Sequence, residues 1–244
     1  MIKVMGIVNV TPDSFSDGGR YFRTEEAIRR ARNLVKEGAD IIDLGAESTR
    51  PGATPVEWDE EWSRLEPVLS GVLERGVAVP VSVDTYHPET ARRALEMGAS
   101  IVNCVYAEHV PAMVGLLREF PQTELVMPAS CWGLVEGGEL AARAYLDPMI
   151  GFGTTREEDL ALLRGVRELA KRGRVLVGAS RKRIVKKLTG EKVTGKTLGG
   201  NLGIAVWCAM NGAAAVRVHD VAETVQALKV LEVLNGDLKW SEQT

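Results

Sequence analysis

A short pattern that recurs along the chain constrains its fold more than any other feature of the sequence. Each copy is a Gly-Ala pair, then a run of mostly apolar residues, then a polar residue, and the copies are residues 38–43, 98–103 and 212–217. Glycine commonly ends a helix, and a short apolar run is typical of a buried parallel strand. The pattern therefore predicts repeated helix–strand units with a polar side chain at the far end of each strand.

Units of this kind run from one end of the chain to the other. In the first predicted helix, Thr24 is a plausible N-cap and Gly38 ends the helix, while a later helix opens with Pro88 and closes at Gly98. Eight such units favour a closed barrel, because open sheets usually have fewer strands and no GxGxxG motif follows the first strand. The predicted strands lie at about 2–8, 40–44, 80–83, 100–103, 124–127, 144–147, 175–178 and 214–218.

One unit is shorter than the others. Between the strands at 124–127 and 144–147 there is room only for a short helix, near residues 138–144. The length of 244 residues is typical of one barrel, and no linker or low-complexity segment interrupts it. We therefore predict an α/β fold, a single (β/α)8 TIM barrel over residues 1–244, with an abbreviated fifth βα crossover.

Charge and cysteine content exclude several classes of protein. The net charge of −3 provides no global field for nucleic acid or an anionic membrane, so any anion site must be local. Cys104, Cys131 and Cys208 are odd in number and form no CxxC motif, which argues against a disulfide framework or a structural zinc site. No apolar run is long enough to span a membrane, and we expect a cytoplasmic protein.

Polar residues concentrate where the predicted strands end. In a (β/α)8 barrel the loops at these ends build the active site. One group of short, hydrogen-bonding side chains suits a flat, amide-rich heterocycle: Asp84, Asn103, Asp147 and Lys182. A second group could hold a diphosphate: Asn9, Arg50, Arg217 and His219. Asn9 also offers an oxygen to a Mg²⁺ ion that keeps phosphate oxygens and waters as its other ligands.

Some polar residues near the strand ends also have a purely structural interpretation. An aspartate at the end of a strand can cap the next helix, and for a single aspartate the odds are about even. Asp43 and Asp220 fit that structural role. His87 precedes Pro88 and fits an N-cap, and Lys186 and Lys187 fit a solvated face.

Six motifs make the chain resemble the dihydropteroate synthases along nearly its whole length. The first, NVTPDSFSDGG at Asn9–Gly19, is very specific. The others follow in the family's order and spacing: Glu47–Gly52 (ESTRPG), Ser82–Tyr86 (SVDTY), Asp147–Gly153 (DPMIGFG), Ser180–Lys182 (SRK) and Arg217–Val221 (RVHDV).

This resemblance implies a homodimeric enzyme that joins 6-hydroxymethyl-7,8-dihydropterin diphosphate to para-aminobenzoate and releases diphosphate in folate biosynthesis. It implies that Asp84, Asn103, Asp147 and Lys182 hold the pterin, that Asn9, Arg50, Arg217 and His219 hold the diphosphate, and that Asn9 contacts Mg²⁺. Around the aromatic amine it implies Thr49, Pro51, Phe152, Ser180 and Lys182, and in the first loop Asp17 and Phe15 would order the closed site. Catalysis would fall to Asp84, Lys182, Arg217, His219 and Asp17.

Two alternatives stay open from the sequence. A pterin-dependent methyltransferase that serves a corrinoid protein would share Asp84, Asn103 and Asp147, but it would have little use for the SRK and RVHDV motifs. A non-catalytic pterin-binding descendant of a synthase is favoured by the short crossover and by Cys104, Thr154 and Arg183. The family usually has Asp, Lys and Ser at these three positions.

Overall fold

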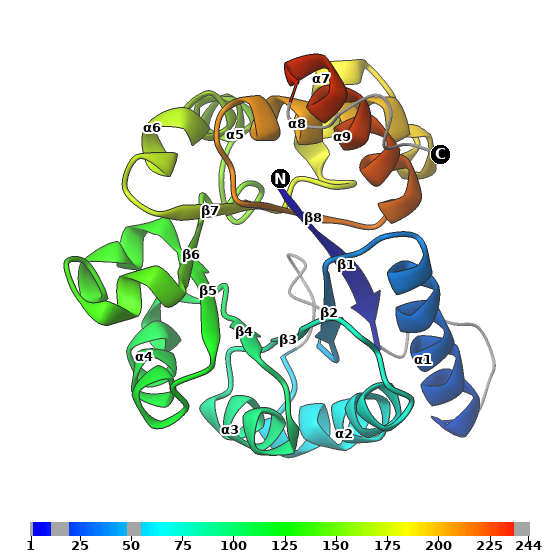
Figure 1. Cartoon of the computed structure of the whole chain (residues 1–244), viewed down its shortest axis with the longest axis vertical. Coiled ribbons are helices and arrows are strands. Elements are labelled where there is room, and N and C mark those ends of the chain that lie inside the picture. The colour runs from blue at the N-terminus through cyan, green and yellow to red at the C-terminus, as the bar shows by residue number, and fades with distance from the viewer. Residues whose placement is uncertain (1, 11–19, 48–54, 237–244) are drawn as a thin grey trace.

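The eight strands close into a parallel barrel in which each strand pairs with the next in sequence and β8 pairs with β1 (Figure 1). The computed structural model describes residues 2–10, 20–47 and 55–236, except for the side chains of 20–23. The strands are β1 (Lys3–Asn9), β2 (Ile41–Gly45), β3 (Val81–Asp84), β4 (Ile101–Asn103), β5 (Glu124–Pro128), β6 (Ala144–Asp147), β7 (Arg174–Val177) and β8 (Ala215–Val218). The predicted barrel and its eight strands are confirmed.

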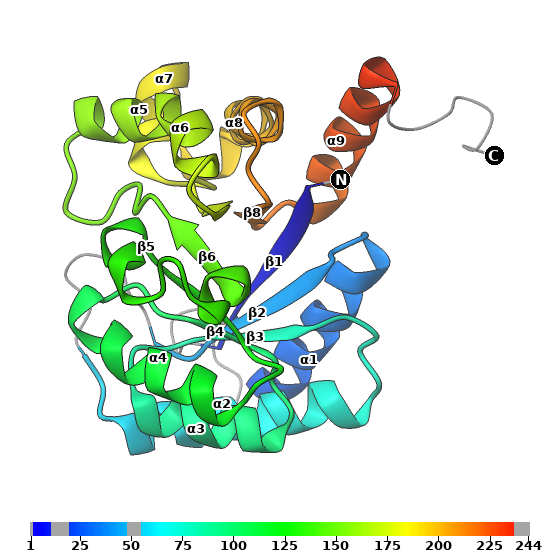
Figure 2. The ribbon, with the colours of Figure 1, turned by 60° about the vertical axis from the view of Figure 1, so that its left-hand side comes forward.

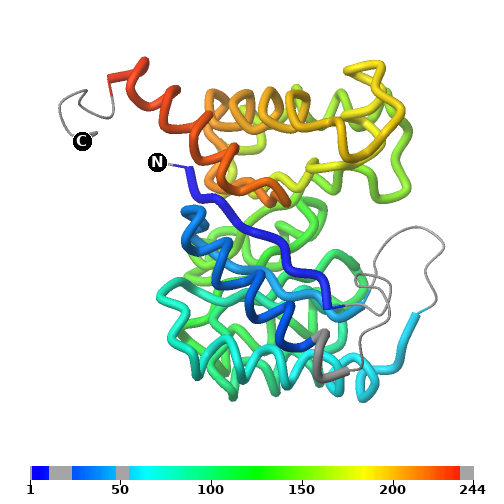
Figure 3. The backbone as a smooth tube through the Cα atoms, turned by 90° about the vertical axis from the view of Figure 1, so that its right-hand side faces the viewer, coloured from blue at the N-terminus to red at the C-terminus, as the bar shows by residue number. Residues whose placement is uncertain are grey.

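Helices surround the barrel, with α1 to α4 on one side and α5 to α9 on the other (Figures 1 and 2). They are α1 (Arg20–Lys36), α2 (Trp58–Glu74), α3 (Pro88–Met97), α4 (Val110–Glu119), α5 (Arg156–Arg164), α6 (Val166–Ala170), α7 (Arg183–Thr189), α8 (Leu198–Met210) and α9 (Val221–Asn235). The short 3₁₀ helices are η2 (Ala107–His109), η3 (Ala129–Leu134), η4 (Glu139–Arg143) and η5 (Thr194–Lys196). The start of β1 and the end of α9 lie on the same side of the molecule (Figure 3). No helix in the described part of the chain is long and apolar enough to cross a membrane.

Local sequence sets most helix ends as expected, with one correction. Pro88 opens α3 and Gly98 closes it in the left-handed conformation at φ 119°, which glycine adopts without strain. The expected N-cap at Thr24 is wrong, because α1 begins at Arg20 and Thr24 lies inside it. Residues 20–23 contain no helix breaker, so the helix extends one turn further toward the N-terminus.

The interior of the barrel is built in layers, because alternate residues of a strand face the same side. The middle layer is a fully buried apolar cluster of Met5, Ile41, Ile101, Val126, Tyr145, Leu176 and Ala215. Two residues further along their strands, toward the carboxyl ends, come Asp43, Asn103, Asp147 and Arg217. Two residues back come Glu124 and Arg174. An apolar layer in the middle of the barrel therefore separates the polar layer at one end from the polar layer at the other.

The fifth crossover is abbreviated, as predicted, and the short helix expected near residues 138–144 is the 3₁₀ helix η4, which η3 precedes. Arg143 is the last residue of η4, and its side chain lies against the C-terminal end of α4. Its guanidinium donates to the backbone oxygens of Leu117, Phe120 and Thr123, and to that of Pro121, at 2.6–3.1 Å. It thereby satisfies carbonyls at and just beyond the end of α4 that a helix leaves unpaired.

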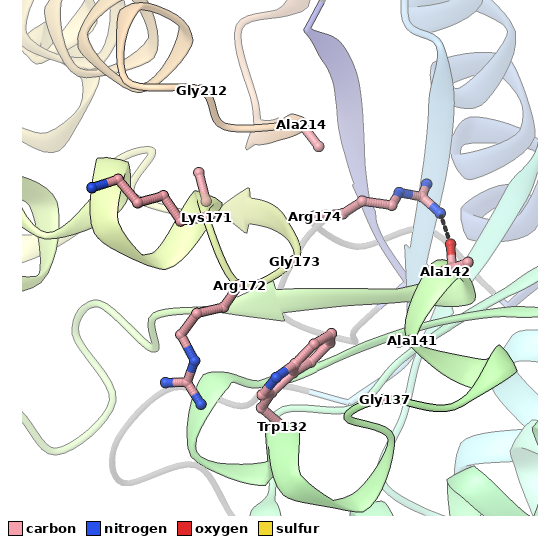
Figure 4. A pocket seen from close by; sticks show the side chains of 11 residues that line it. Trp132, Gly137, Ala141, Ala142, Lys171, Arg172, Gly173, Arg174, Gly212 and Ala214 are labelled. Carbon is pink, nitrogen blue, oxygen red and sulfur yellow. Dashed lines mark hydrogen bonds between the residues drawn. The ribbon is translucent and has the colours of Figure 1, made fainter.

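A cavity of about 600 Å³ lies beside this crossover, at the end of the barrel where the strands begin (Figure 4). Trp132 of η3, Arg174 of β7 and Gly212, which follows α8, are among its lining residues. Although it is a large hollow, it is far along the strands from the polar residues that the sequence singles out, so it does not define the functional site.

Candidate active site

The polar layer at the carboxyl ends of the strands gathers five side chains from five strands. Asp84, Asn103 and Asp147 are the last residues of β3, β4 and β6, while Asp43 is the middle residue of β2 and Arg217 the last but one of β8. They meet because parallel strands of a closed barrel all deliver their carboxyl ends to one face. The prediction that Asp84, Asn103 and Asp147 occupy corresponding strand ends is confirmed, and Arg217 lies with them.

Arg217 organises this layer through hydrogen bonds to two carboxylates. Its Nε donates to Asp43 Oδ2 and its Nη2 donates to Asp84 Oδ2, each at 2.6 Å. The amide of Asn103 donates to the same Asp43 oxygen at 3.3 Å. Asp43, interpreted from the sequence as a helix cap, is instead the carboxylate that holds Arg217 and Asn103. Its position two residues beyond the inward-facing Ile41 is the signal that identifies it.

Three buried acceptor atoms in this layer have no hydrogen-bond partner within the described chain. They are Asp43 Oδ1, Asp84 Oδ1 and Asn103 Oδ1. Buried carboxylate and amide oxygens are rarely left unpaired, because each costs about 1–3 kcal/mol in that state. Three such atoms at the mouth of a barrel indicate a site for a ligand that carries several N–H groups.

Burial and pairing shift the protonation of this layer. Burial raises the pKa of Asp84 to about 7, with Asp43 and Glu61 adding to the shift and Arg217 opposing it. Burial also raises the pKa of Asp147 against the influence of Lys182. Burial alone would lower the pKa of Arg217, but Asp43 and Asp84 raise it, so the guanidinium stays charged.

Lys182 reaches the layer from the loop after β7. Its ammonium Nζ donates to the Ile150 carbonyl oxygen at 2.6 Å and lies 4.3 Å from the centre of the Phe152 ring. Burial lowers the pKa of Lys182 to about 8, with Asp147 and other carboxylates opposing that effect. Lys182 and Phe152, both predicted from the sequence, therefore lie in contact at the rim of the site.

The loops that follow β6 and β7 contain strained backbone. Met149 has φ 64° and Arg181 has φ 60°, and they are the two non-glycine residues in the left-handed region within the described ranges. Each such residue costs of order 1–3 kcal/mol and persists only where its surroundings enforce it. Here Met149 N donates to Asp147 Oδ1 at 2.7 Å, and Arg181 N donates to Asn201 Oδ1 at 3.1 Å. Strain at these two positions supports a functional site.

Ser180 and His219 form a pair beside the strand that carries Arg217. The Ser180 hydroxyl lies 3.0 Å from His219 Nδ1 and accepts from the His219 backbone N–H at 3.3 Å. The His219 carbonyl oxygen in turn accepts from Arg30 Nη2 at 2.9 Å. The pair links the loop after β7 to the end of β8, next to the charged layer.

Asn9 is half-buried at the end of β1, where it aligns with Gly45 of β2. No group of three or more His, Cys, Asp or Glu side chains suited to a metal occurs among the described residues. A single amide oxygen fits a Mg²⁺ ion that binds together with a phosphate-bearing ligand, and does not fit one that binds the protein alone.

Five other predicted residues lie outside the described ranges. They are Phe15 and Asp17 in the first loop and Thr49, Arg50 and Pro51 in the second.

Fold and site together define a class. A (β/α)8 barrel whose strand ends present carboxylates, an amide, an arginine and a lysine to an N–H-rich ligand is a barrel enzyme with a site for a flat heterocycle. The family model described as "Pterin binding enzyme" matches residues 5–131 and 134–219. The chain belongs to the dihydropteroate synthase family of pterin-binding enzymes, which confirms the resemblance drawn from its motifs.

Relatives and solved structures agree on this family. The dihydropteroate synthase of Neisseria meningitidis serogroup B is 39% identical, with 97% of this chain and 94% of that protein covered. That of Bacillus subtilis is 36% identical, with coverages of 95% and 88%. The structure of the Xanthomonas albilineans dihydropteroate synthase with 4-aminobenzoic acid is 37% identical over 96% of this chain and 93% of that one, with a TM-score of 0.88. These likenesses favour the synthase over the corrinoid methyltransferase and the non-catalytic descendant.

Proposed function

We propose that the chain condenses 6-hydroxymethyl-7,8-dihydropterin diphosphate with para-aminobenzoate and releases diphosphate. The observation that carries this proposal is the set of three unpartnered oxygens on Asp43, Asp84 and Asn103, with the Lys182 ammonium across the same mouth. The pterin ring offers several N–H donors to such oxygens and a carbonyl to such an ammonium. Asp147 adds a further buried carboxylate to this set.

The reaction exchanges one bond at the exocyclic methylene carbon of the pterin. The C–O bond to diphosphate breaks, and diphosphate leaves with the electron pair. The amine nitrogen of para-aminobenzoate forms the new C–N bond and loses one proton. The Asp84 carboxylate favours the positive charge that develops on the pterin, and Arg217 and His219 stabilise the negative charge that develops on the leaving group.

The arrangement explains why no nucleophilic side chain is needed. As the C–O bond breaks, the methylene carbon becomes electrophilic enough for a neutral arylamine to attack it. Phe152, Ser180 and Lys182 supply an aromatic face, a hydroxyl and a cation on the side of the mouth after β6 and β7, where the aromatic acid would bind. Thr49, Arg50, Pro51 and Asp17 would complete the site from the first two loops.

Asn9 would hold a Mg²⁺ ion through its amide oxygen, together with the diphosphate oxygens. When bound, the ion supplies charge neutralisation on the leaving diphosphate. Asn9→Ala is therefore expected to raise the Mg²⁺ concentration needed for half-maximal rate, while binding of pteroic acid, which has no phosphate, stays unchanged.

An assay of diphosphate release tests the proposed reaction. It uses the dihydropterin diphosphate and Mg²⁺, with and without para-aminobenzoate. Release that depends on the amine, with dihydropteroate formed, is the expected result. Pterin binding without amine-dependent release would replace the proposal with a non-catalytic descendant, and activity that requires a corrinoid protein would replace it with a methyltransferase.

We propose further that the enzyme is a homodimer formed through α8 and α9. These helices pack against each other and expose large apolar side chains, with Met210 59% exposed and Leu234 78% exposed. Trp207 and Val230 are also exposed on the two helices. A two-fold axis would pack such a face against its own copy and bury these side chains. Sedimentation of the wild type is expected to give a dimer, and Met210→Glu is expected to give a monomer.

The proposed location is the cytoplasm. All three cysteines are free thiols, with Cys104 and Cys208 buried. Free cysteines suit a reducing compartment.

A further inference from the structure

A single peptide group connects Lys182 to a buried carboxylate outside the catalytic layer. The Ile150 carbonyl oxygen accepts from Lys182 Nζ at 2.6 Å, and the Gly151 N–H donates to Asp159 Oδ1 at 2.7 Å. These two groups belong to the same planar peptide, in which C=O and N–H point in opposite directions. Whatever fixes the N–H therefore also fixes the direction of the carbonyl.

Asp159, near the start of α5, is held by contacts to three residues, Gly151, Thr154 and Arg156. Its side chain is fully buried in α5, and it is the acceptor for the Thr154 hydroxyl at 2.5 Å. Arg156 Nη1 forms an ion pair with Asp159 Oδ2 at 2.7 Å, and Arg156 Nη2 donates to the Thr154 carbonyl at 2.7 Å. Burial of a carboxylate is costly unless it is paired and hydrogen-bonded, so this arrangement commits Asp159 to one geometry.

We propose that Asp159 is a positioning residue for Lys182, acting through the Ile150–Gly151 peptide, and this inference rests on the proposed function. By holding the Gly151 N–H, the carboxylate aims the Ile150 carbonyl at the Lys182 ammonium. The ammonium is thereby kept over Phe152 at the mouth of the site. None of the predicted site residues lies on α5, so this extends the working site by one element.

The backbone at Gly151 fits this role. Gly151 has φ 78°, and a Cβ atom there would lie 3.1 Å from Lys182 Cδ. Any other residue would be strained and would push against the lysine side chain. The lysine and the peptide therefore pack directly against each other as well as sharing a hydrogen bond.

The Asp159 charge also acts on Lys182. Asp147 on β6, Asp84 on β3 and Asp159 on α5 favour the charged ammonium, while burial and Arg217 on β8 disfavour it. Neutralising Asp159 removes one of the three favourable charges, which lowers the pKa of Lys182.

Asp159→Asn tests the proposal because it keeps the shape and an acceptor atom but removes the charge. We expect the alkaline limb of kcat/KM for the pterin diphosphate to move to lower pH. The KM for the pterin diphosphate at neutral pH should rise about 3- to 10-fold, with kcat little changed, because the Lys182 contact serves the bound pterin in ground and transition states alike. Asp159→Ala, which also releases the Gly151 N–H, should raise this KM further.

Two control variants distinguish a loss of Lys182 positioning from a general loosening of α5. Thr154→Val removes a hydroxyl that bonds both Gly151 N and Asp159 but leaves the charge, so it should raise KM without moving the alkaline limb. Glu158→Gln removes the charge of an exposed carboxylate in the same turn, whose contacts are to Thr155 in the capping box. It should leave both KM and the alkaline limb unchanged.

Binding of pteroic acid, measured by calorimetry across the pH range, provides a readout independent of turnover. The positioning role is supported if Asp159→Asn binds pteroic acid more weakly than the wild type and loses this binding at a lower pH. This result would support it even if the wild type formed no dihydropteroate, in which case only the proposed reaction would fail. Wild-type KM, binding and alkaline limb in Asp159→Asn would overturn the positioning role. The same shifts in Glu158→Gln would overturn it too.

Discussion

Two arginines occupy opposite ends of the barrel and show how differently one kind of residue can be used. Arg217, near the end of β8, pairs with Asp43 and Asp84 at the mouth where the strands finish. Arg174, the first residue of β7, pairs with Glu124 at the end where the strands begin. The apolar layer around Tyr145 separates them.

The two networks differ in what they leave unpaired. Arg174 bonds Glu124 and the Ala142 carbonyl, and its guanidinium lies 3.8 Å from the centre of the Tyr145 ring (Figure 4 shows the Ala142 contact). Within the described chain no buried carboxylate oxygen of this network lacks a partner. Around Arg217, in contrast, Asp43 and Asp84 each keep one buried oxygen without a donor. Spare buried carboxylate oxygens, which can accept from a ligand, therefore occur in the Arg217 network and not in the Arg174 network of the described chain.

The largest expected effect comes from weakening the network at the mouth. Arg217→Lys keeps the charge but loses the planar fork that bonds two carboxylates and that, in the proposed reaction, faces the leaving group. We expect kcat to fall roughly 10²–10³-fold, as on loss of one preorganised donor. Steady-state assays of diphosphate release measure this change. Arg174→Lys is the matched control at the other end of the barrel and should keep kcat within about twofold. A near wild-type kcat in Arg217→Lys would contradict the contrast between the Arg217 and Arg174 networks.

A smaller effect, on stability alone, is expected at the opposite end. Arg174→Met keeps a long side chain but removes the bonds to Glu124 and Ala142. Because the pair is partly exposed, we expect a loss of about 1–2 kcal/mol in the free energy of unfolding, with turnover unchanged. Denaturant unfolding measures it. Arg172→Met, at the neighbouring exposed position, should change stability by no more than about 0.5 kcal/mol. Equal losses in both variants would show that the Arg174 network contributes no more to the free energy of unfolding than an exposed arginine does.

The smallest expected effect that distinguishes the two ends of the barrel is on the pH dependence of kcat/KM. In the proposed reaction Asp84 is ionised to accept from the pterin, and its pKa of about 7 then makes activity rise as pH passes that value. In the same proposal Lys182 is protonated to donate, and its pKa of about 8 then makes activity fall above it. We therefore expect a narrow bell in kcat/KM between these values. Asp84→Asn should abolish the acidic limb, whereas Arg174→Met should leave both limbs in place.

Much of the fold and part of the site follow from the sequence because they depend on local periodicity. Apolar runs place each strand, Gly38 and Gly98 follow the ends of helices, and residues two positions apart face the same side of a strand. Asp84, Asn103 and Asp147 could be grouped because a closed barrel brings equivalent strand ends together. The short stretch before β6 excluded a full helix by length alone.

The pairing of those side chains was decided only by the tertiary structure. Asp43 and Arg217 are 174 residues apart and meet because β8 closes on β1 beside β2. Asp159 reaches Lys182 through one peptide whose orientation depends on the strained turn at Met149 and on Gly151. Sequence spacing fixes which face of a strand a residue occupies, but a hydrogen bond needs a partner at about 3 Å with the right direction. That condition is met only once the barrel has closed and the loops have packed.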